Sequence, residues 1–346
     1  MTDMTNDRKL EHIDIILNDT NVDRQKKHWD AISLKNRALP EINFADVDTS
    51  LNFLGKKCAM PLIISSMTGG DHNVVNRINQ NLARAAEETG VAMAVGSQRV
   101  LFTSENARSS FDLRPLAPNA PLIANLGGVQ LNYGFGRDEC KKAVDVLKAD
   151  ALYFHLNPLQ EVIQPEGNTN FSNLARQIGE ITRQLSVPVI LKEVGAGFSE
   201  ADAELVIKNG IRYIDVAGQG GTSWSRIENA RHQSSGPGLE FQDWGIPTPA
   251  ALRLLRPFQN DLSIIASGGI RGGIDMAKAL ILGANMCGIA GPFLARAMES
   301  SDQVVDYIQR LQHELSMAMF LLGATTINEL RNRDDLILSQ QFPSAP

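Results

Sequence analysis

This chain lacks the features that would tie it to a membrane, a nucleic acid or an oxidising compartment. Its three cysteines, Cys58, Cys140 and Cys287, lie far apart without metal-ligand spacing, which indicates reduced thiols in a cytoplasm. A net charge of -6 argues against non-specific nucleic-acid binding and a membrane-surface role. No apolar run reaches transmembrane length, and the polar N-terminus has no signal-peptide core. We therefore expect a cytoplasmic protein with no membrane or nucleic-acid partner.

The chain does contain enough apolar sequence for one large domain, since 43% of its 346 residues are hydrophobic. From residue 61 onward, short apolar runs alternate with helical patterns, and no helix-only or strand-only block interrupts them. The expected strands are 61–67, 91–96, 122–126, 151–156, 187–194, 211–217 and two runs that begin at 262 and 285. The expected helices are 74–89, 138–148, 172–185, 199–208, 249–255, 274–280, one that begins near Pro292, and 302–323. Eight strands separated by helices predict a (β/α)8 TIM barrel.

Three regions are expected along the chain. Residues 1–55 form a polar N-terminal extension that contributes to the substrate site, with one amphipathic stretch at 9–17. Residues 56–325 form the barrel, with a Gly/Ser-rich segment inserted after the sixth strand and ending at Gly245. Residues 326–346 form a C-terminal tail, which we expect to be loosely ordered from Leu336.

The strongest local pattern is a strand that ends in glycines before a helix. It runs from Leu262 through Ser267-Gly268-Gly269-Ile270-Arg271, and a similar turn recurs at 285–291. Glycines let backbone N–H groups approach an anion, and a new helix adds its partly positive N-terminus. TIM barrels commonly build a phosphate site after strands seven and eight, so we favour phosphate binding over two tight turns without a ligand.

Polar residues follow nearly every expected strand, where the active site of a TIM barrel lies. They are Ser66, Met67, Thr68, Ser97, Gln98, Arg99, Asn125, His155, Asn157, Gln160, Glu161, Lys192, Glu193 and the loop 218–224. Any one of them can be a structural hydrogen-bonding group, but their recurrence favours a functional mouth. The glycines of the loop either admit a phosphate or ring, or form a flexible lid.

Three of these residues have alternative interpretations. Lys192 needs a partner, either a negatively charged ligand or a salt bridge across the barrel, because neighbouring Glu193 faces the opposite way. His155 is either a structural hydrogen-bonding group or a ligand contact. Glu161 is a lone carboxylate, which can hold Mg²⁺ only jointly with substrate phosphates.

Taken together, these motifs resemble the type 2 isopentenyl diphosphate isomerases. The resemblance rests on Arg8-Lys9 with His12 and on the segments 66–70, 97–99, 155–161, 220–224 and 267–271, and it spans residues 8–291. The segments 66–70, 97–99 and 155–161 are the most specific, whereas 267–271 is shared with other FMN barrels. The resemblance implies an FMN enzyme, reduced by NAD(P)H, that interconverts isopentenyl and dimethylallyl diphosphate with Mg²⁺.

The resemblance also implies the roles of individual residues. Flavin-lining residues would be Ser66, Met67, Thr68, Ser97, Asn125, Lys192 and Thr222, with the flavin phosphate held by Gly269, Ile270, Arg271, Ala290 and Gly291. Substrate would contact Arg99, His155, Asn157 and Gln160, of which His155 and Gln160 are candidate catalytic residues with Lys192, and Glu161 would bind Mg²⁺. Arg8 and Lys9 would reach the diphosphate from a neighbouring subunit, which implies a homo-oligomer.

The implied chemistry agrees with the residues. Moving the double bond adds one proton and removes another, and the sequence shows no strong acid for protonating an unactivated alkene. A reduced flavin can supply that proton from N5, and Lys192 can stabilise its anionic ring. The group that removes the C2 proton stays open between the flavin and a group bound to Gln160.

Three alternatives are less favoured. A 2-hydroxy acid oxidase carries a His-Gly-Gly-Arg-type motif before the phosphate site, whereas this chain reads Gly-Pro-Gly-Leu-Glu at 236–240. An IMP-dehydrogenase-like enzyme needs a nucleophilic cysteine after strand six, and the cysteines lie elsewhere. A non-catalytic flavin-binding barrel does not account for polar residues around the whole mouth.

Overall fold

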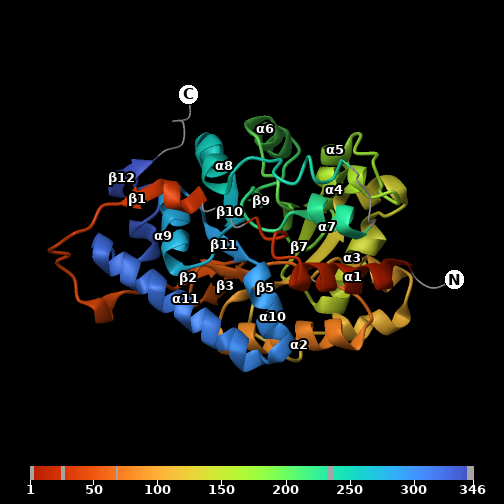
Figure 1. The fold of residues 1–346 in the computed structure, drawn as a ribbon, viewed down its shortest axis with the longest axis horizontal. Coiled ribbons are helices and arrows are strands. Elements are labelled where there is room, and N and C mark those ends of the chain that lie inside the picture. The colour runs from red at the N-terminus through yellow and green to blue at the C-terminus, as the bar shows by residue number, and fades with distance from the viewer. Residues whose placement is uncertain (1–3, 25–27, 68, 232–236, 341–346) are drawn as a thin grey trace.

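The protein folds around a closed barrel of eight parallel strands, which confirms the predicted TIM barrel (Figure 1). The computed structural model describes residues 4–24, 28–67, 69–231 and 237–340. In order around the barrel, the strands are β4 (Leu62–Ile64), β5 (Ala92–Ala94), β6 (Leu122–Gly127), β7 (Ala151–Leu156), β8 (Val189–Glu193), β9 (Tyr213–Asp215), β10 (Ser263–Ser267) and β11 (Met286–Ile289). Pairing of β11 with β4 closes the ring.

Helices surround the strands and cover the mouth of the barrel. They are α1 (Met4–Asn18), α2 (Asn73–Thr89), α3 (Arg137–Leu147), α4 (Pro158–Ile163), α5 (Leu174–Thr182), α6 (Glu200–Lys208), α7 (Trp224–Arg231), α8 (Thr248–Leu255), α9 (Gly273–Ile281), α10 (Gly291–Glu299) and α11 (Ser301–Leu322). Short 3-10 helices are η1 (His28–Ala31), η2 (Phe44–Asp46), η3 (Gln98–Phe102), η4 (Glu105–Ser110), η5 (Gly128–Tyr133), η6 (Arg256–Phe258), η7 (Ile327–Glu329) and η8 (Asp334–Leu336). No helix in these described ranges is long and apolar enough to cross a membrane.

Side chains along each barrel strand alternate between two layers of core. Ile63, Ile190 and Ile265 pack inside the barrel, whereas the adjacent Leu62 and Ile264 pack against the surrounding helices. The residue two positions after each interior isoleucine therefore also faces inward, at the carboxyl end of its strand. This alternation positions the polar groups described below.

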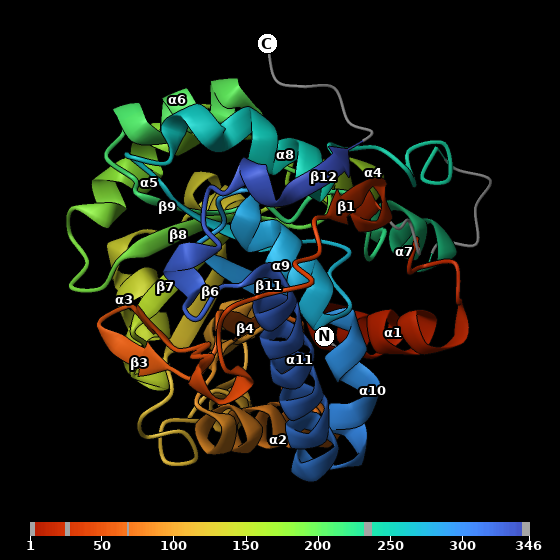
Figure 2. The same ribbon diagram turned by 90° about the vertical axis from the view of Figure 1, so that its left-hand side faces the viewer.

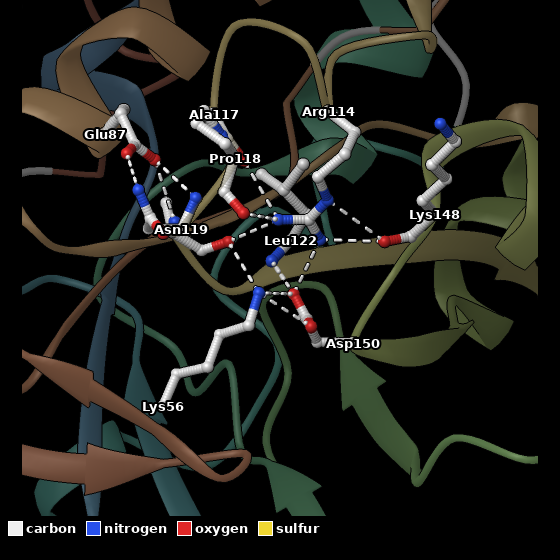
Figure 3. A network of polar contacts seen from close by, with 10 residues as sticks. Lys56, Glu87, Arg114, Ala117, Pro118, Asn119, Leu122, Lys148 and Asp150 are labelled. Carbon is white, nitrogen blue, oxygen red and sulfur yellow. Dashed lines mark hydrogen bonds and ion pairs between the residues drawn. The ribbon is translucent and has the colours of Figure 1, made fainter.

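A hairpin of β2 (Leu51–Phe53) and β3 (Lys56–Cys58) plugs the opposite end, with Phe53 and Cys58 packed against the barrel interior. The hairpin crosses the expected boundary between residues 55 and 56. From β3, Lys56 reaches Asp150, which also binds Arg114 (Figure 3). This base network lies at the amino-terminal ends of β6 and β7.

The two ends of the chain lie against the barrel. Strand β1 (Ile32–Leu34) pairs antiparallel with β12 (Ile337–Gln340), and the two lie side by side in Figure 2. The expectation of a loose tail from Leu336 was therefore wrong for 337–340, because a distant strand supplies its backbone partners. The rest of that tail lies outside the described residues.

Candidate active site

A cavity of about 520 Å³ opens at the carboxyl ends of the barrel strands. The loops that follow the strands form its walls, and α1 covers one side with Ile13, Ile16 and Leu17. Trp224, at the start of α7, lines it as well and packs edge-on against His12. A cavity with one apolar wall and many polar groups suits a small ligand with an apolar body and a charged end.

Loops after three strands bring small residues together at one end of the cavity. A Cβ placed on Gly221 would lie 3.2 Å from the backbone N of Gly269, and one on Gly291 would lie 3.9 Å from Thr222 Oγ1. Gly268 and Gly269 have φ of +105° and +77°, which glycine adopts without strain. Helix α10 begins at Gly291, which also lines this end of the cavity. The arrangement fits a phosphate group held by backbone N–H groups and the Thr222 hydroxyl.

Arg271 lies at this end but its guanidinium group is engaged with protein. It donates to the carbonyl oxygens of Gly269 (2.8 Å) and Gly220 (3.1 Å) and pairs with Asp23 at 2.5 Å. Arg271 therefore ties the phosphate-end loops to the segment that follows α1. Its predicted contact with the flavin phosphate stays a prediction.

Asn125 and His155 are joined on the opposite wall. His155 Nδ1 lies 2.8 Å from Asn125 Oδ1, which can only accept, so Nδ1 carries the proton of this bond. Asn125 Nδ2 in turn donates to Ser66 Oγ (2.8 Å) and to the carbonyl oxygen of Val95 (3.0 Å). Three residues predicted from different strands thus form one hydrogen-bonded chain along the cavity.

Lys192 pairs with a carboxylate of the protein, but on the neighbouring strand rather than across the barrel floor. Its Nζ lies 3.1 Å from Oδ2 of Asp215, a completely buried carboxylate on the neighbouring strand β9. Asp215 was missed, although alternation along 211–217 places it on the same interior face as Tyr213. As expected, Glu193 faces the other way, where the backbone N–H groups of residues 194–197 donate to its carboxylate.

Burial raises the pKa of Glu193 to about 7, although those N–H groups act against the shift. The carboxylate fastens the loop after β8, next to Lys192. Glu193 is therefore a loop-fixing residue rather than the partner of the ammonium.

Asn157, Gln160 and Glu161 lie together at the start of α4. Asn157 Nδ2 donates to Gln160 Oε1 (3.0 Å) and to Glu161 Oε1 (2.9 Å). Glu161 Oε2 accepts from Gln164 Nε2 (2.8 Å) and from the backbone N–H of Asn168 (2.6 Å). Within the described structure, the buried Oδ1 of Asn157 has no hydrogen-bond partner. An oxygen-rich corner with one unsatisfied oxygen fits a hard cation such as Mg²⁺.

Glu228 of α7 is the second residue that sequence reasoning missed. Its Oε1 accepts from Gln160 Nε2 (2.6 Å) and His12 Nε2 (3.1 Å), and Oε2 accepts from Arg231 at 2.5 Å. Burial acts to raise the pKa of Glu228, but these donors outweigh it and lower the pKa to about 2. Nothing in the sequence around Glu228 resembles a site motif, because its partners come from distant segments.

Helix α1 lies over the mouth of its own chain's barrel and packs against α7, as the views in Figures 1 and 2 agree. Lys9 lines the cavity of the same chain, whereas the resemblance implied that it serves a neighbouring subunit. The side chain of Arg8 lies outside the described residues. The structure therefore places Lys9 in cis, and a contribution across subunits stays a prediction.

The other predicted residues also gather at the cavity. Its lining includes Ser66, Met67, Ser97, Arg99, Ile270 and Ala290, while Thr68 lies outside the described residues. Among the described residues, no group of three or more His, Cys, Asp or Glu side chains could hold a metal ion by itself. The site is thus a barrel mouth with one glycine-lined end and one oxygen-rich corner.

Comparison with known proteins agrees with this arrangement. A model of the FMN-dependent dehydrogenase family matches residues 7–110 and 145–337. Isopentenyl-diphosphate delta-isomerase of Hydrogenovibrio crunogenus is 54% identical, over 96% of this chain and 97% of that protein. The enzymes of the same name from Paracoccus zeaxanthinifaciens and Rickettsia akari are 53% and 45% identical, over 95% and 93% of this chain and 96% and 95% of those proteins.

Solved structures share the fold at low identity. A flavocytochrome b2 variant has a TM-score of 0.69 at 19% identity, with 97% of this chain and 86% of that chain covered. A mandelate oxidase variant has a TM-score of 0.61 at 19% identity, with 89% and 88% covered. The chain belongs to the FMN-dependent dehydrogenase family and, within it, to the isopentenyl-diphosphate delta-isomerases.

Proposed function

We propose that this chain interconverts isopentenyl diphosphate and dimethylallyl diphosphate in the cavity at the barrel mouth. The observation that carries the proposal is that one cavity joins a glycine-lined phosphate end to the Asn157–Gln160–Glu161 corner. Two phosphate-bearing molecules, a flavin and a prenyl diphosphate, can therefore meet there. The names of the near full-length relatives support the same activity.

We assign the flavin to the phosphate end and the adjoining wall. Backbone N–H groups near Gly269, Ile270 and Gly291, with Ala290 and Thr222 alongside, would hold the phosphate, and the bracing by Arg271 would keep their loops together. Ser66, Met67, Ser97, Asn125 and Lys192 line the remaining wall for the ring. Reduced FMN supplies an electron-rich ring and an exchangeable proton at N5. NAD(P)H is the proposed reductant.

The diphosphate would lie between Lys9 and the oxygen-rich corner. Lys9 and Arg99 line the cavity with His155 and Asn157, and Arg8 adjoins Lys9 in the sequence. The positive charges of Arg8, Lys9 and Arg99 offset the cost of desolvating the diphosphate. Glu161, with the unsatisfied Oδ1 of Asn157 beside it, would hold Mg²⁺ jointly with substrate oxygens.

Gln160 is held in one orientation for the reaction. Its Nε2–H donates to Glu228, so its Oε1 is the atom that Asn157 binds. Burial lowers the pKa of His12, so its imidazole is neutral at neutral pH and holds a proton on Nε2 for Glu228. Glu228 stays ionised, because its pKa is about 2. This ionised carboxylate lies one hydrogen bond behind Gln160 and fixes its orientation, while the acceptor of the C2 proton stays open.

We further propose a homo-oligomer in the cytoplasm. All three cysteines are free and buried, which agrees with a reducing compartment. Oligomer formation rests on the family resemblance.

A spectrum and an assay test the proposal. The purified protein should be yellow, with pigment that denaturation releases as non-covalent FMN and that dithionite bleaches. The dithionite-reduced protein with Mg²⁺ should convert isopentenyl to dimethylallyl diphosphate, and the oxidised protein should not. A colourless protein that FMN fails to stabilise, or a reduced FMN-loaded protein without turnover, would contradict the proposal.

A further inference from the structure

We propose that Asp215 is a positioning residue for Lys192, whose charge it partly balances, and that it thereby sets the reduction potential of bound FMN. The inference rests on the proposed function, because it requires the flavin to lie beside Lys192. Asp215 itself would not touch the flavin.

The geometry makes Asp215 the fixed partner of the ammonium. Oδ2 lies 3.1 Å from Lys192 Nζ and 3.0 Å from the Tyr153 hydroxyl, which donates to it. Oδ1 accepts from Ser267 Oγ and from the backbone N–H of Ala217 (3.2 Å). With both oxygens bound, the carboxylate has one orientation, and the lysine has a fixed partner.

The two charges differ in their access to the cavity. Lys192 and Asp215 are register partners on β8 and β9, yet the lysine lines the cavity and the aspartate does not. The Asp215 side chain is 0% exposed and the Lys192 side chain is 8% exposed. A ring in the cavity would therefore meet the ammonium first, with the carboxylate behind it.

This order has an electrostatic consequence. Reduced flavin ionised at N1 carries one more negative charge than oxidised flavin, so a nearby ammonium favours reduction. A carboxylate behind the ammonium opposes that effect, and little water separates the charges. Asp215 should therefore hold the reduction potential below the value that Lys192 alone would produce.

Asp215→Asn tests this, because it removes the charge and keeps the shape. We expect reduced FMN to bind about tenfold more tightly relative to oxidised FMN, which raises the midpoint potential by about 30 mV for a two-electron couple. The potential is measured against a redox dye of known potential in the FMN-loaded protein. Lys192→Met should shift the potential in the opposite direction.

The double variant shows whether Asp215 acts through Lys192. Without the ammonium, Asp215 has no cavity-facing charge to balance. Adding Asp215→Asn to Lys192→Met should therefore change the potential little. An equal shift in both backgrounds, or an unchanged potential for Asp215→Asn alone, would overturn the proposal.

Two further variants provide a second test and a control. Tyr153→Phe removes a neutral donor from Oδ2 and leaves more of its charge uncompensated, so we expect about a threefold shift opposite to that of Asp215→Asn. This variant decides the question if Asp215→Asn does not fold, and no shift would contradict us. Asp150→Asn makes the same charge change at the base and should leave the potential unchanged. If the wild-type protein binds no FMN, the proposed function fails rather than this inference.

Discussion

Both ends of the barrel hold a lysine–aspartate pair, but the two pairs have different surroundings. At the base, Lys56 and Asp150 are 2.8 Å apart, and their side chains are 30% and 19% exposed. At the mouth, Lys192 and Asp215 are 3.1 Å apart and almost fully buried. The separations are similar, so the difference lies in what each pair touches.

The base pair connects loops of the protein to one another. Asp150 also accepts from the backbone N–H of Leu122 (2.8 Å) and from Arg114, which in turn donates to carbonyl oxygens including those of Ala117 and Lys148 (Figure 3). In the mouth pair, by contrast, Lys192 faces a cavity, with Asp215 buried behind it. Similar ion pairs therefore hold loops together at one end and, at the other, place one charge against the cavity.

The largest expected effect comes from Glu228→Gln, which breaks the buried network at the mouth. The lowered pKa of Glu228, about 2 instead of 4.5, corresponds to about 3 kcal/mol of stability at neutral pH. Because the folded state depresses this pKa, the contribution is present above pH 4.5 and lost as pH falls toward 2. Denaturant unfolding should show a wild-type advantage of that order at pH 7, which shrinks below pH 4.5. If the difference in unfolding free energy between wild type and Glu228→Gln does not depend on pH, the ionised Glu228 does not provide this stability.

Next is Glu161→Gln, which should lower kcat/KM about a hundredfold by weakening Mg²⁺ and diphosphate binding. Raising Mg²⁺ should partly restore activity, and steady-state kinetics over a Mg²⁺ series checks this. The control is Glu87→Gln, which changes an equivalent carboxylate near the base and should leave the metal dependence as in wild type. If Glu161→Gln has the wild-type metal dependence, Glu161 is not the ligand.

A smaller effect is expected from Lys9→Ala, which should raise the substrate KM about tenfold and leave FMN bound. Because α1 lies over its own barrel, we also expect Lys9 to act in the cavity of its own chain. Mixing Lys9→Ala with a variant defective in FMN binding tests this placement against the implied contribution across subunits, and the cis placement predicts no restored activity once subunit exchange is proven. Restored activity would show instead that Lys9 serves a neighbouring subunit.

The smallest effect is expected at the base. Asp150→Asn should lower the unfolding free energy by about 1 kcal/mol, since its partly exposed ion pairs are screened by solvent. Turnover and FMN content should match wild type. Denaturant unfolding and steady-state kinetics measure the two quantities. A loss of turnover in the folded variant would remove the distinction between base and mouth.

The fold and the place of the site could be predicted from local sequence patterns. Alternating strand and helix signals located all eight barrel strands, and 151–156 matched β7 at both ends. Glycines after β10 marked a tight turn at the mouth, because a turn with positive φ restricts residue type locally. The inward position of Asp215 could also have been predicted from the sequence, since alternation along the strand places it on the same face as Tyr213.

The partners of the site residues depended on the tertiary structure. Gln160 meets Glu228, 68 positions away, and His12 meets the same carboxylate across 216 positions. These contacts arise because barrel closure and the packing of α1 on α7 bring separate segments together, and no local spacing encodes that meeting. The same holds for Lys9 over its own barrel. Residue types along the chain thus determined the barrel and the position of its mouth, whereas long-range packing decided which charges are neutralised there and which face the cavity.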